Sequence, residues 1–187
     1  MRKLKLQMQT TLDAFVAAAD GGLDWMIWDW DAELKKYVTE LTAPVDLILL
    51  GRNLAEGFID AWTSRLDLPA PENDGARKMV ETPKIVFSKS LANNRWENAE
   101  VFGGDLVEKI NELKNRDGGD IIAYGGARFV SSLIENDLID EYHLFVNPVA
   151  LGKGMTIFGA LAGKLNLKLA GSKSFPCGIA GLFYQPK

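Results

Sequence analysis

Residues 120–135 read Asp-Ile-Ile-Ala-Tyr-Gly-Gly-Ala-Arg-Phe-Val-Ser-Ser-Leu-Ile-Glu, and this stretch decides the fold class. Ile121 to Tyr124 is a short apolar run suited to a buried strand, and Gly125-Gly126 closes it. A stripe of apolar side chains at helical spacing follows: Phe129, Val130, Leu133 and Ile134. A glycine pair between such a strand and such a helix predicts a strand-turn-helix unit, the building block of parallel sheets.

The same alternation extends toward the N-terminus. Apolar runs suited to buried strands occupy three further segments: 45–50, 84–88 and 99–102. Helical spacing of apolar residues marks 34–41, 54–62 and 106–113, the last with Asp105 as its cap. Residues 64–82 contain several turn-forming residues, and we expect mainly an exposed loop there.

The two ends of the chain complete the pattern. Residues 3–9 alternate leucine or methionine with lysine or glutamine, which predicts a half-buried first strand. Asp140 to Val149 reads as one long strand, and Leu165 to Gln185 as two strands joined through 175–178. The order predicts an α/β fold with a largely parallel sheet, helices on both faces and antiparallel C-terminal strands.

Composition narrows the class of protein. The chain has 187 residues, 47% of them hydrophobic and 25% charged, so we expect a single domain over 1–187. No segment has the apolar length of a membrane span, and no signal-peptide pattern is present, which predicts a cytoplasmic protein without a membrane partner. A net charge of −4 argues against a nucleic-acid partner. Cys177 and His143 are the only residues of their kinds, and we predict no metal site.

Three loops carry chemistry suited to a phosphate group. Ligands of such sheets bind at the carboxyl ends of the strands, where Gly51-Arg52, Ser88-Lys89-Ser90 and Gly125-Gly126-Ala127-Arg128 lie. Glycine lets the backbone approach a ligand, and the amides at a helix start attract anions. Each loop has a plainer interpretation, as an ordinary turn with a surface arginine, as a polar turn or helix cap, or as a simple glycine turn.

The acidic candidates are less specific. Asp13 follows the first strand, and Asp24, Asp29 and Asp31 flank three tryptophans. A carboxyl group beside aromatic walls would have a raised pKa and could transfer a proton. Asp31 is better interpreted as a helix cap, which leaves Asp13 and Asp24 as candidate catalytic residues. We expect His143 to be a structural histidine.

These motifs resemble a known family. Four stretches carry the resemblance: 10–17, Leu49-Leu50-Gly51-Arg52, 84–91 and 120–158. The chain resembles the dihydrofolate reductase-like superfamily nearly end to end, and most closely the branch related to the reductase domain of riboflavin biosynthesis. The resemblance implies a mainly parallel sheet flanked by helices. It also implies hydride transfer from NADPH to a pterin, pyrimidine or related heterocycle.

The resemblance also implies roles for individual residues. The loop matching 14–25 would close over the nicotinamide, Gly51-Arg52 and 88–90 would hold the 2′-phosphate side, and 125–129 the pyrophosphate. The cofactor-binding residues predicted in this way are Val16, Ala17, Gly22, Gly51, Arg52, Asn53, Ser88, Lys89, Ser90, Gly103, Tyr124, Gly125, Gly126, Ala127, Arg128 and Phe129. In two respects the chain departs from the family. Asn53 and Leu54 stand where many members have a threonine and an aromatic residue, and the basic residues that riboflavin reductases offer to a phosphoribosyl group have no evident counterpart.

Two other functions remain open. The chain could be a non-catalytic module that binds a dinucleotide or another small ligand on the same fold. A metal-free hydrolase using Asp13 and His143 would require those two side chains to meet. The apolar tail strands and the resemblance also predict a homodimer, through sheet edges in the C-terminal part.

Overall fold

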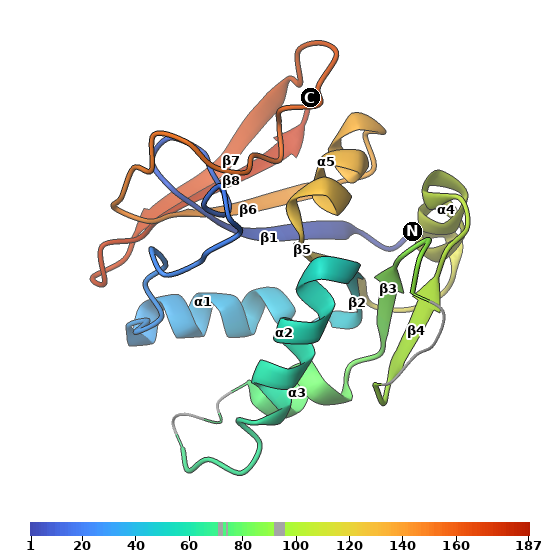
Figure 1. Ribbon diagram of the computed structural model, residues 1–187, viewed down its shortest axis with the longest axis horizontal. Helices are drawn as coiled ribbons and strands as arrows, with labels where there is room; N and C mark the ends of the chain where they lie inside the picture. The colour runs from blue at the N-terminus through green and yellow to red at the C-terminus, as the bar shows by residue number, and fades with distance from the viewer. Residues whose placement is uncertain (71–72, 74, 92–95) are drawn as a thin grey trace.

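A computed structural model describes residues 1–70, 73, 75–91 and 96–187 of the chain (Figure 1). The described strands are β1 (Leu4–Thr10), β2 (Val45–Gly51), β3 (Lys84–Phe87), β4 (Ala99–Phe102), β5 (Asp120–Gly125), β6 (Glu141–Val146), β7 (Leu167–Ser174) and β8 (Ala180–Pro186). The described helices are α1 (Ala32–Thr42), α2 (Arg52–Thr63), α3 (Ala76–Glu81), α4 (Leu106–Asn115) and α5 (Ala127–Glu135). None of the helices in these ranges is long and apolar enough to cross a membrane.

The strands form one sheet in the order β4-β3-β2-β5-β1-β6-β8-β7. Each neighbouring pair from β4 to β6 is parallel, and β8 is antiparallel to both β6 and β7. The predicted class is therefore confirmed: a mainly parallel sheet with antiparallel strands at its C-terminal end. The parallel part requires crossover connections, and described helices lie in all of them except the one from β3 to β4, part of which lies outside the described residues.

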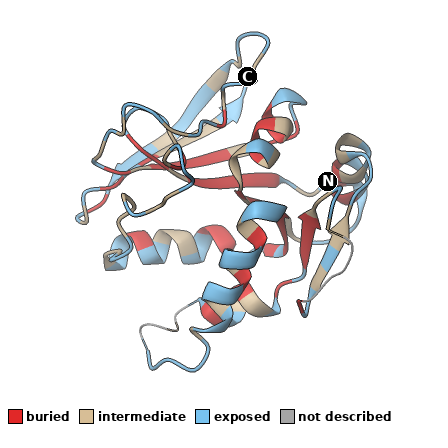
Figure 2. Cartoon of the chain, in the orientation of Figure 1, coloured by how far each residue is buried: buried red, intermediate tan, exposed pale blue. Residues whose placement is uncertain are grey.

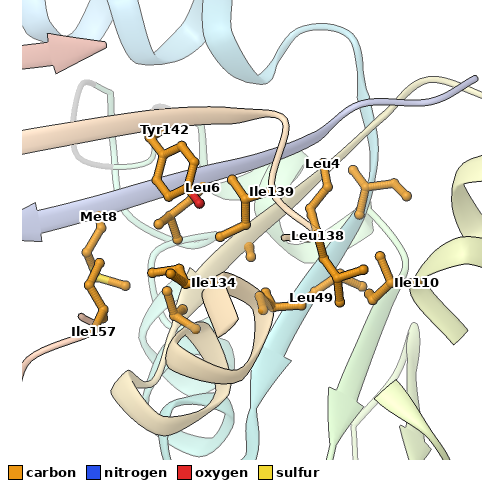
Figure 3. Close-up of a cluster of buried hydrophobic side chains, with 14 of the residues drawn as sticks. Leu4, Leu6, Met8, Leu49, Ile110, Ile134, Leu138, Ile139, Tyr142 and Ile157 are labelled. Atoms are coloured by element: carbon orange, nitrogen blue, oxygen red, sulfur yellow. The ribbon is translucent and has the colours of Figure 1, made fainter. Parts of the chain in front are cut away.

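Helices cover both faces of the sheet, and each face has its own core. On one face α4 and α5 pack on the strands, with Leu4, Leu6 and Met8 of β1 pointing into that core (Figure 3). On the other face the core contains Leu41 of α1 together with residues of α2 and α3. Buried residues accordingly lie in the strands and on the sheet-facing sides of the helices (Figure 2). Such double coverage is typical of parallel sheets.

The prediction of a half-buried first strand was wrong. Lys5 and Gln7 lie on the opposite face of β1 from its leucines, yet each is only 7% exposed. The Nζ atom of Lys5 lies 2.8 Å from a carboxylate oxygen of Asp120 and 3.4 Å from the carbonyl of Leu41 in α1. α1 thus covers this face of β1, although the polar residues on that face predict exposure to solvent.

Two other segments also differ from the prediction. The expected loop at 64–82 contains α3, whose Ala76 and Met79 are buried; residues 71, 72 and 74 of that stretch lie outside the described residues. Turn-forming residues around this six-residue helix conceal its short apolar pattern. The expected strand from 140 to 149 ends at Val146, because Pro148 has no amide hydrogen with which to continue a ladder.

Candidate active site

The site lies where the chain changes direction across the sheet. β5 and β1 are neighbours, but the connection after β1 leads through α1 to β2, and the connection after β5 leads through α5 to β6. The two connections leave in opposite directions, and the region outside the carboxyl ends of these strands, called the crevice below, is where ligands of such sheets bind. Two groups of loops border this crevice. We call the turns after β2, β3, β4 and β5 the glycine edge, residues 11–31 the β1 loop, and residues 147–156 the β6 loop.

At the glycine edge, the turns after β2 and β5 are in direct contact. A Cβ atom added to Gly51 would lie 2.8 Å from Cβ of Phe129 and 3.0 Å from the amide nitrogen of Gly126. Only glycine at position 51 permits this approach. A Cβ atom added to Gly126 would meet nothing within 4 Å, so there is open space beside this turn. The two turns that the sequence assigns to phosphate binding are therefore neighbours in the structure.

Two helices begin at these turns without a side-chain cap. Gly51 is the N-cap of α2 and Gly126 is the N-cap of α5, and neither offers a side chain to the first amides of its helix. Gly125 has a φ of 136°, which favours glycine, and its peptide bond with Gly126 is cis. Amides at the start of a helix have no partner within the helix and attract anions. The glycine edge therefore has two adjacent helix starts without side-chain caps, a feature that suits an anion.

Polar side chains extend this edge. Nη1 of Arg52 donates to Oγ of Ser90 at 3.1 Å, which joins the turns after β2 and β3. Ser88 uses its hydroxyl as an acceptor for the amides of Ser90 and Leu91, so the plainer interpretation as a polar turn applies to this residue. Lys89 is exposed, and a Cβ atom on Gly103 would lie 3.1 Å from the carbonyl oxygen of Ser88. The turn after β4 thus belongs to the same edge.

Three aromatic rings, those of Phe87, Phe102 and Phe129, pack against one another at the glycine edge. Phe129 is stacked on Phe87 with ring centroids 4.9 Å apart, and Phe102 meets Phe87 edge-on at 5.7 Å. Tyr124 differs from the other predicted cofactor residues, because its hydroxyl donates to Sδ of Met79 in α3 at 3.6 Å. That hydroxyl is turned toward the core and away from the glycine pair. Asn53 and Arg128 are exposed in the first turns of their helices.

The β1 loop and the β6 loop lie side by side at the other border (Figure 1). The amide of Leu12 donates to the carbonyl of Val149 at 2.8 Å. Met155 exchanges hydrogen bonds with Val16 and Ala17, each at 2.8 Å, and both of the latter are buried. Gly22 closes a turn within the β1 loop by accepting from the amide of Ala18 at 3.0 Å. These bonds make the two loops one connected border.

Asn147 is a central residue of this border, and the sequence analysis did not single it out. Its side chain is fully buried. Nδ2 donates to Oε1 of Gln9 at 2.7 Å and also lies near the carbonyls of Thr10 and Phe145. Oδ1 accepts from the amide of Ile27 at 2.9 Å. One amide side chain therefore joins β1, β6 and the β1 loop; the sequence pattern put Asn147 inside a strand from 140 to 149 and gave no sign of these contacts.

The carboxylate of Asp13 serves the same border. It accepts from the hydroxyl of Thr11 at 2.6 Å and from the amide of Gly152 at 2.7 Å, with Leu151 slightly farther away. The hydroxyl of Thr11, followed by the amides of the β6 loop, lowers the pKa of Asp13. An ionised carboxylate with these partners is a poor proton donor. Asp24, the second acidic candidate, is exposed on the β1 loop.

Asp31 is the N-cap of α1, as expected. Its Oδ1 accepts from the amides of Glu33 and Leu34, and its Oδ2 accepts from the amide of Cys177 at 2.9 Å. Burial acts to raise the pKa of Asp31, but these amides outweigh it and lower the pKa to about 2. The raised pKa considered for a carboxyl group near the tryptophans does not apply to this residue. Asp31 instead links α1 to the turn between β7 and β8.

His143 lies within the sheet face covered by α1. Its Nδ1 is 2.8 Å from the hydroxyl of Tyr37, and its Nε2 is 3.5 Å from a carboxylate oxygen of Glu141. Burial lowers the pKa of His143, although Glu141 opposes this effect. His143 and Asp13 each have other partners, so the pair that a hydrolase would need is not formed. Within the described ranges, no three His, Cys, Asp or Glu side chains cluster as a metal site would require.

Comparisons with known proteins give a consistent result. The family model described as the RibD C-terminal domain matches residues 2–180. The chain is 31% identical over 190 residues to the "Uncharacterized protein YyaP" of Bacillus subtilis (strain 168), covering 98% of this chain and 95% of that protein. Two solved structures show the same fold over the whole chain. A protein provisionally assigned to riboflavin biosynthesis from Shewanella sp. PV-4 has a TM-score of 0.74 at 23% identity, with 99% of it covered. A diaminohydroxyphosphoribosylaminopyrimidine deaminase/5-amino-6-(5-phosphoribosylamino)uracil reductase from Thermotoga maritima has a TM-score of 0.71 at 20% identity, with 57% of it covered.

Proposed function

This chain belongs to the RibD C-terminal domain family, and from that premise we propose that it is a reductase that uses NADPH to reduce a small heterocycle. The observation that carries the proposal is the glycine edge. Two uncapped helix starts converge there, because Gly51 contacts both Gly126 and Phe129. A pyrophosphate needs this combination of free amides and close backbone approach.

The preference for NADPH over NADH rests on Arg52 and Ser90. Their side chains meet across two neighbouring turns, are both exposed and lie beside Lys89. A guanidinium, an ammonium and a hydroxyl together suit the 2′-phosphate that distinguishes NADPH. The residues present therefore fit this cofactor.

NADPH would supply the hydride, and the chain would hold and orient the reactants. In this proposal the β1 loop shields the reacting atoms from water, with the β6 loop holding it in place through Asn147 and Asp13. Asp13 does not serve as the acid, since its hydrogen bonds favour the ionised form. Asp24, or solvent, then delivers the proton.

The test is a calorimetric titration of NADPH and NADH into the wild-type chain and an Arg52→Ala variant. We expect NADPH to bind more tightly than NADH, and Arg52→Ala to weaken NADPH binding by about tenfold, in keeping with a charge-assisted contact. NADH affinity should stay within about twofold. Arg77→Ala is the matched control, because Arg77 is exposed and pairs with Glu81 of its own helix. Equal affinity for both nucleotides, or no binding, would contradict the proposal.

One observation favours the second candidate, a non-catalytic binding module. The acidic residue just after β1 is engaged with the β6 loop and is not available for proton transfer. NADPH binding without any oxidation of NADPH, across pterins and aminopyrimidines, would support that alternative. A turnover signal with any of them would exclude it.

A homodimer and a cytoplasmic location remain part of the proposal. β7 is an edge strand, and its Leu169 is 52% exposed, which offers an apolar contact for a second copy. Light scattering should then give twice the chain mass of 20.6 kDa. A measured mass near that of one chain would remove the dimer from the proposal.

A further inference from the structure

The two borders of the crevice have opposite charge. Residues 6–34, which include the whole β1 loop, contain no lysine, arginine or histidine. They contain six acidic residues: Asp13, Asp20, Asp24, Asp29, Asp31 and Glu33. In the glycine edge, in contrast, the turns at 51–52, 88–90 and 125–128 carry Arg52, Lys89 and Arg128 and no acidic residue. An anionic ligand is therefore attracted to one border and repelled by the other.

The acidic border is also aromatic and lies next to the glycine pair. β1 pairs with β5, so the β1 loop leaves the sheet beside the strand that ends at the glycine pair. The loop has three tryptophans within six residues, of which Trp28 is 60% exposed. Trp30 is held by a 2.8 Å hydrogen bond from its Nε1 to the carbonyl of Ile27. Indole rings of this kind suit a flat ring.

Buried polar atoms of β1 and of the β1 loop have no partner among the described residues, which is a second, independent observation. Oε1 of Gln7, Nε2 of Gln9 and Nε1 of Trp25 are buried without a hydrogen bond. Gln7 is 7% exposed, and alternation along β1 puts both glutamines on the α1 face. Gln9 meets the β1 loop through Asn147 and Ile27. One acceptor and two donors without partners are costly unless a ligand satisfies them.

We propose that the substrate is a planar heterocycle without a phosphate group, which packs against the tryptophans of the β1 loop and presents an amide-type edge to Gln7 and Gln9. An amide-type ring edge carries both donors and acceptors, as the unpartnered atoms require. The proposal rests on the reductase function above and specifies its substrate class. It differs from the phosphoribosyl substrate in the name of the Thermotoga maritima relative.

Charge explains why a phosphate is excluded. Lys153 is the one cation in residues 147–156, whereas residues 6–34 contain six carboxylates, of which Asp13 and Asp31 accept from backbone amides and Glu33 pairs with Lys173. The first cation after this acidic segment is Lys35 of α1. Lys173 of β7 is paired with Glu33 at 2.9 Å. A substrate phosphate would therefore face like charges without a dedicated partner.

The first experiment measures binding to the chain saturated with NADP⁺. The probes are 5-amino-6-ribosylaminouracil and 6-hydroxymethylpterin, each with and without a terminal phosphate. For at least one ring, we expect the form without phosphate to bind about tenfold more tightly than the phosphorylated form. Equal or tighter binding of the phosphorylated forms would overturn the proposal. In that case, weaker binding of the phosphorylated forms to Lys153→Ala would identify Lys153 as the phosphate contact. Failure of all four probes to bind would also overturn it.

The second experiment tests the glutamine contact with Gln7→Met. Methionine has a similar shape but cannot accept the hydrogen bond, so binding of the unphosphorylated ring should weaken by about tenfold. NADPH affinity and thermal stability should be unchanged or increased, because an unpartnered buried acceptor is removed. Gln185→Met, on an exposed glutamine of β8, should change neither. A Gln7→Met variant that binds the ring as the wild type does would exclude the contact.

Calorimetry with NADPH distinguishes the two levels of failure. If NADPH binds and the ring probes do not, the substrate class fails and the reductase proposal survives. If NADPH does not bind either, the proposed function itself fails.

Discussion

The glycine edge and the border formed by the β1 and β6 loops differ in structure and in the kind of side chain they present. The glycine edge consists of residues that directly follow strand ends, with two uncapped helix starts and three exposed cations. The other border consists of the acidic and aromatic β1 loop and the β6 loop beside it, which are held together by buried side chains such as Asn147. One border uses chemistry that many phosphate sites share, whereas the other depends on contacts particular to this chain.

In the proposed function, the glycine edge would bind phosphate groups in general, and the β1 loop would select a particular substrate. Free amides at a helix start attract any phosphate, so the glycine edge can be kept while substrates change. In the proposed function the β1 loop borders the substrate, and we expect its charge and its rings to determine which substrate binds. Variants that damage only one border should therefore separate cofactor binding from substrate binding.

The largest expected effect comes from Asn147→Ala, which breaks the loop border. The change removes a fully buried side chain that makes hydrogen bonds to Gln9 and Ile27, and leaves those groups without a partner. We expect the free energy of unfolding to fall by about 3 kcal/mol, measured by urea denaturation. Asn136→Ala, on an exposed side chain with one local bond, should cost less than about 0.5 kcal/mol. If NADPH affinity fell as much as ring affinity, the two borders would not be separable.

Gly51→Ala should break the glycine edge instead. The new Cβ atom would lie 2.8 Å from Cβ of Phe129, so the turns after β2 and β5 must move apart. We expect a loss of about 1 to 3 kcal/mol in stability, together with loss of NADPH binding in calorimetry. Gly57→Ala in the same helix has open space around it and should raise stability by about 0.5 to 1 kcal/mol. Unchanged NADPH binding in Gly51→Ala would refute the role given to this contact.

Asp13→Asn should loosen the connection between the two loops without unfolding either. Asparagine can still accept from Leu151 and Gly152, but it lacks the charge that strengthens those bonds. Hydrogen exchange at these two amides should become about three to ten times faster, as followed by NMR. Asp20→Asn, within an exposed turn, should leave both rates unchanged. Unchanged exchange in the Asp13 variant would show that the β6 loop is held by other contacts.

The smallest expected effect is a pH dependence that sharpens the structural role of His143. Burial lowers its pKa below the ordinary 6.5, with Tyr37, Glu141 and Lys5 as the polar groups around it. Below pH 6.5 the unfolded chain therefore binds more protons than the folded chain, and stability falls as the pH falls. Urea denaturation at about pH 7.5 and about pH 5.5 measures this loss, which His143→Gln should reduce. An equal loss in the variant would assign the effect to other groups.

Much of the fold could be predicted from local patterns. Periodicity placed the parallel strands and four of the five described helices, because apolar spacing is a local property of the chain. The short helix α3 escaped, since six residues among turn formers carry too little periodicity. Asp31 and Asp105 were recognisable as caps from their positions before apolar stripes, and both accept from the first amides of their helices.

One part of the candidate site could also be expected from the sequence, and another part could not. The turns at Gly51, Ser88 and Gly125 could be expected to meet, because parallel strands end at one edge of a sheet. Asp13 could not be assigned from its neighbours in sequence, because its partners Leu151 and Gly152 lie far along the chain. A carboxylate after a strand looks the same whether it donates a proton or holds a loop.

The sequence by itself determined the alternation of strands and helices, the glycine turns and the acidic character of residues 6–34, because each depends only on residue type and local spacing. Only the tertiary structure decided that Lys5 and Gln7 are buried, since α1 covers a strand face whose residues are polar. It also decided that Asn147 holds the β1 loop, through an amide 120 positions away. Contacts over such separations follow from how the layers pack, and local patterns contain no record of them.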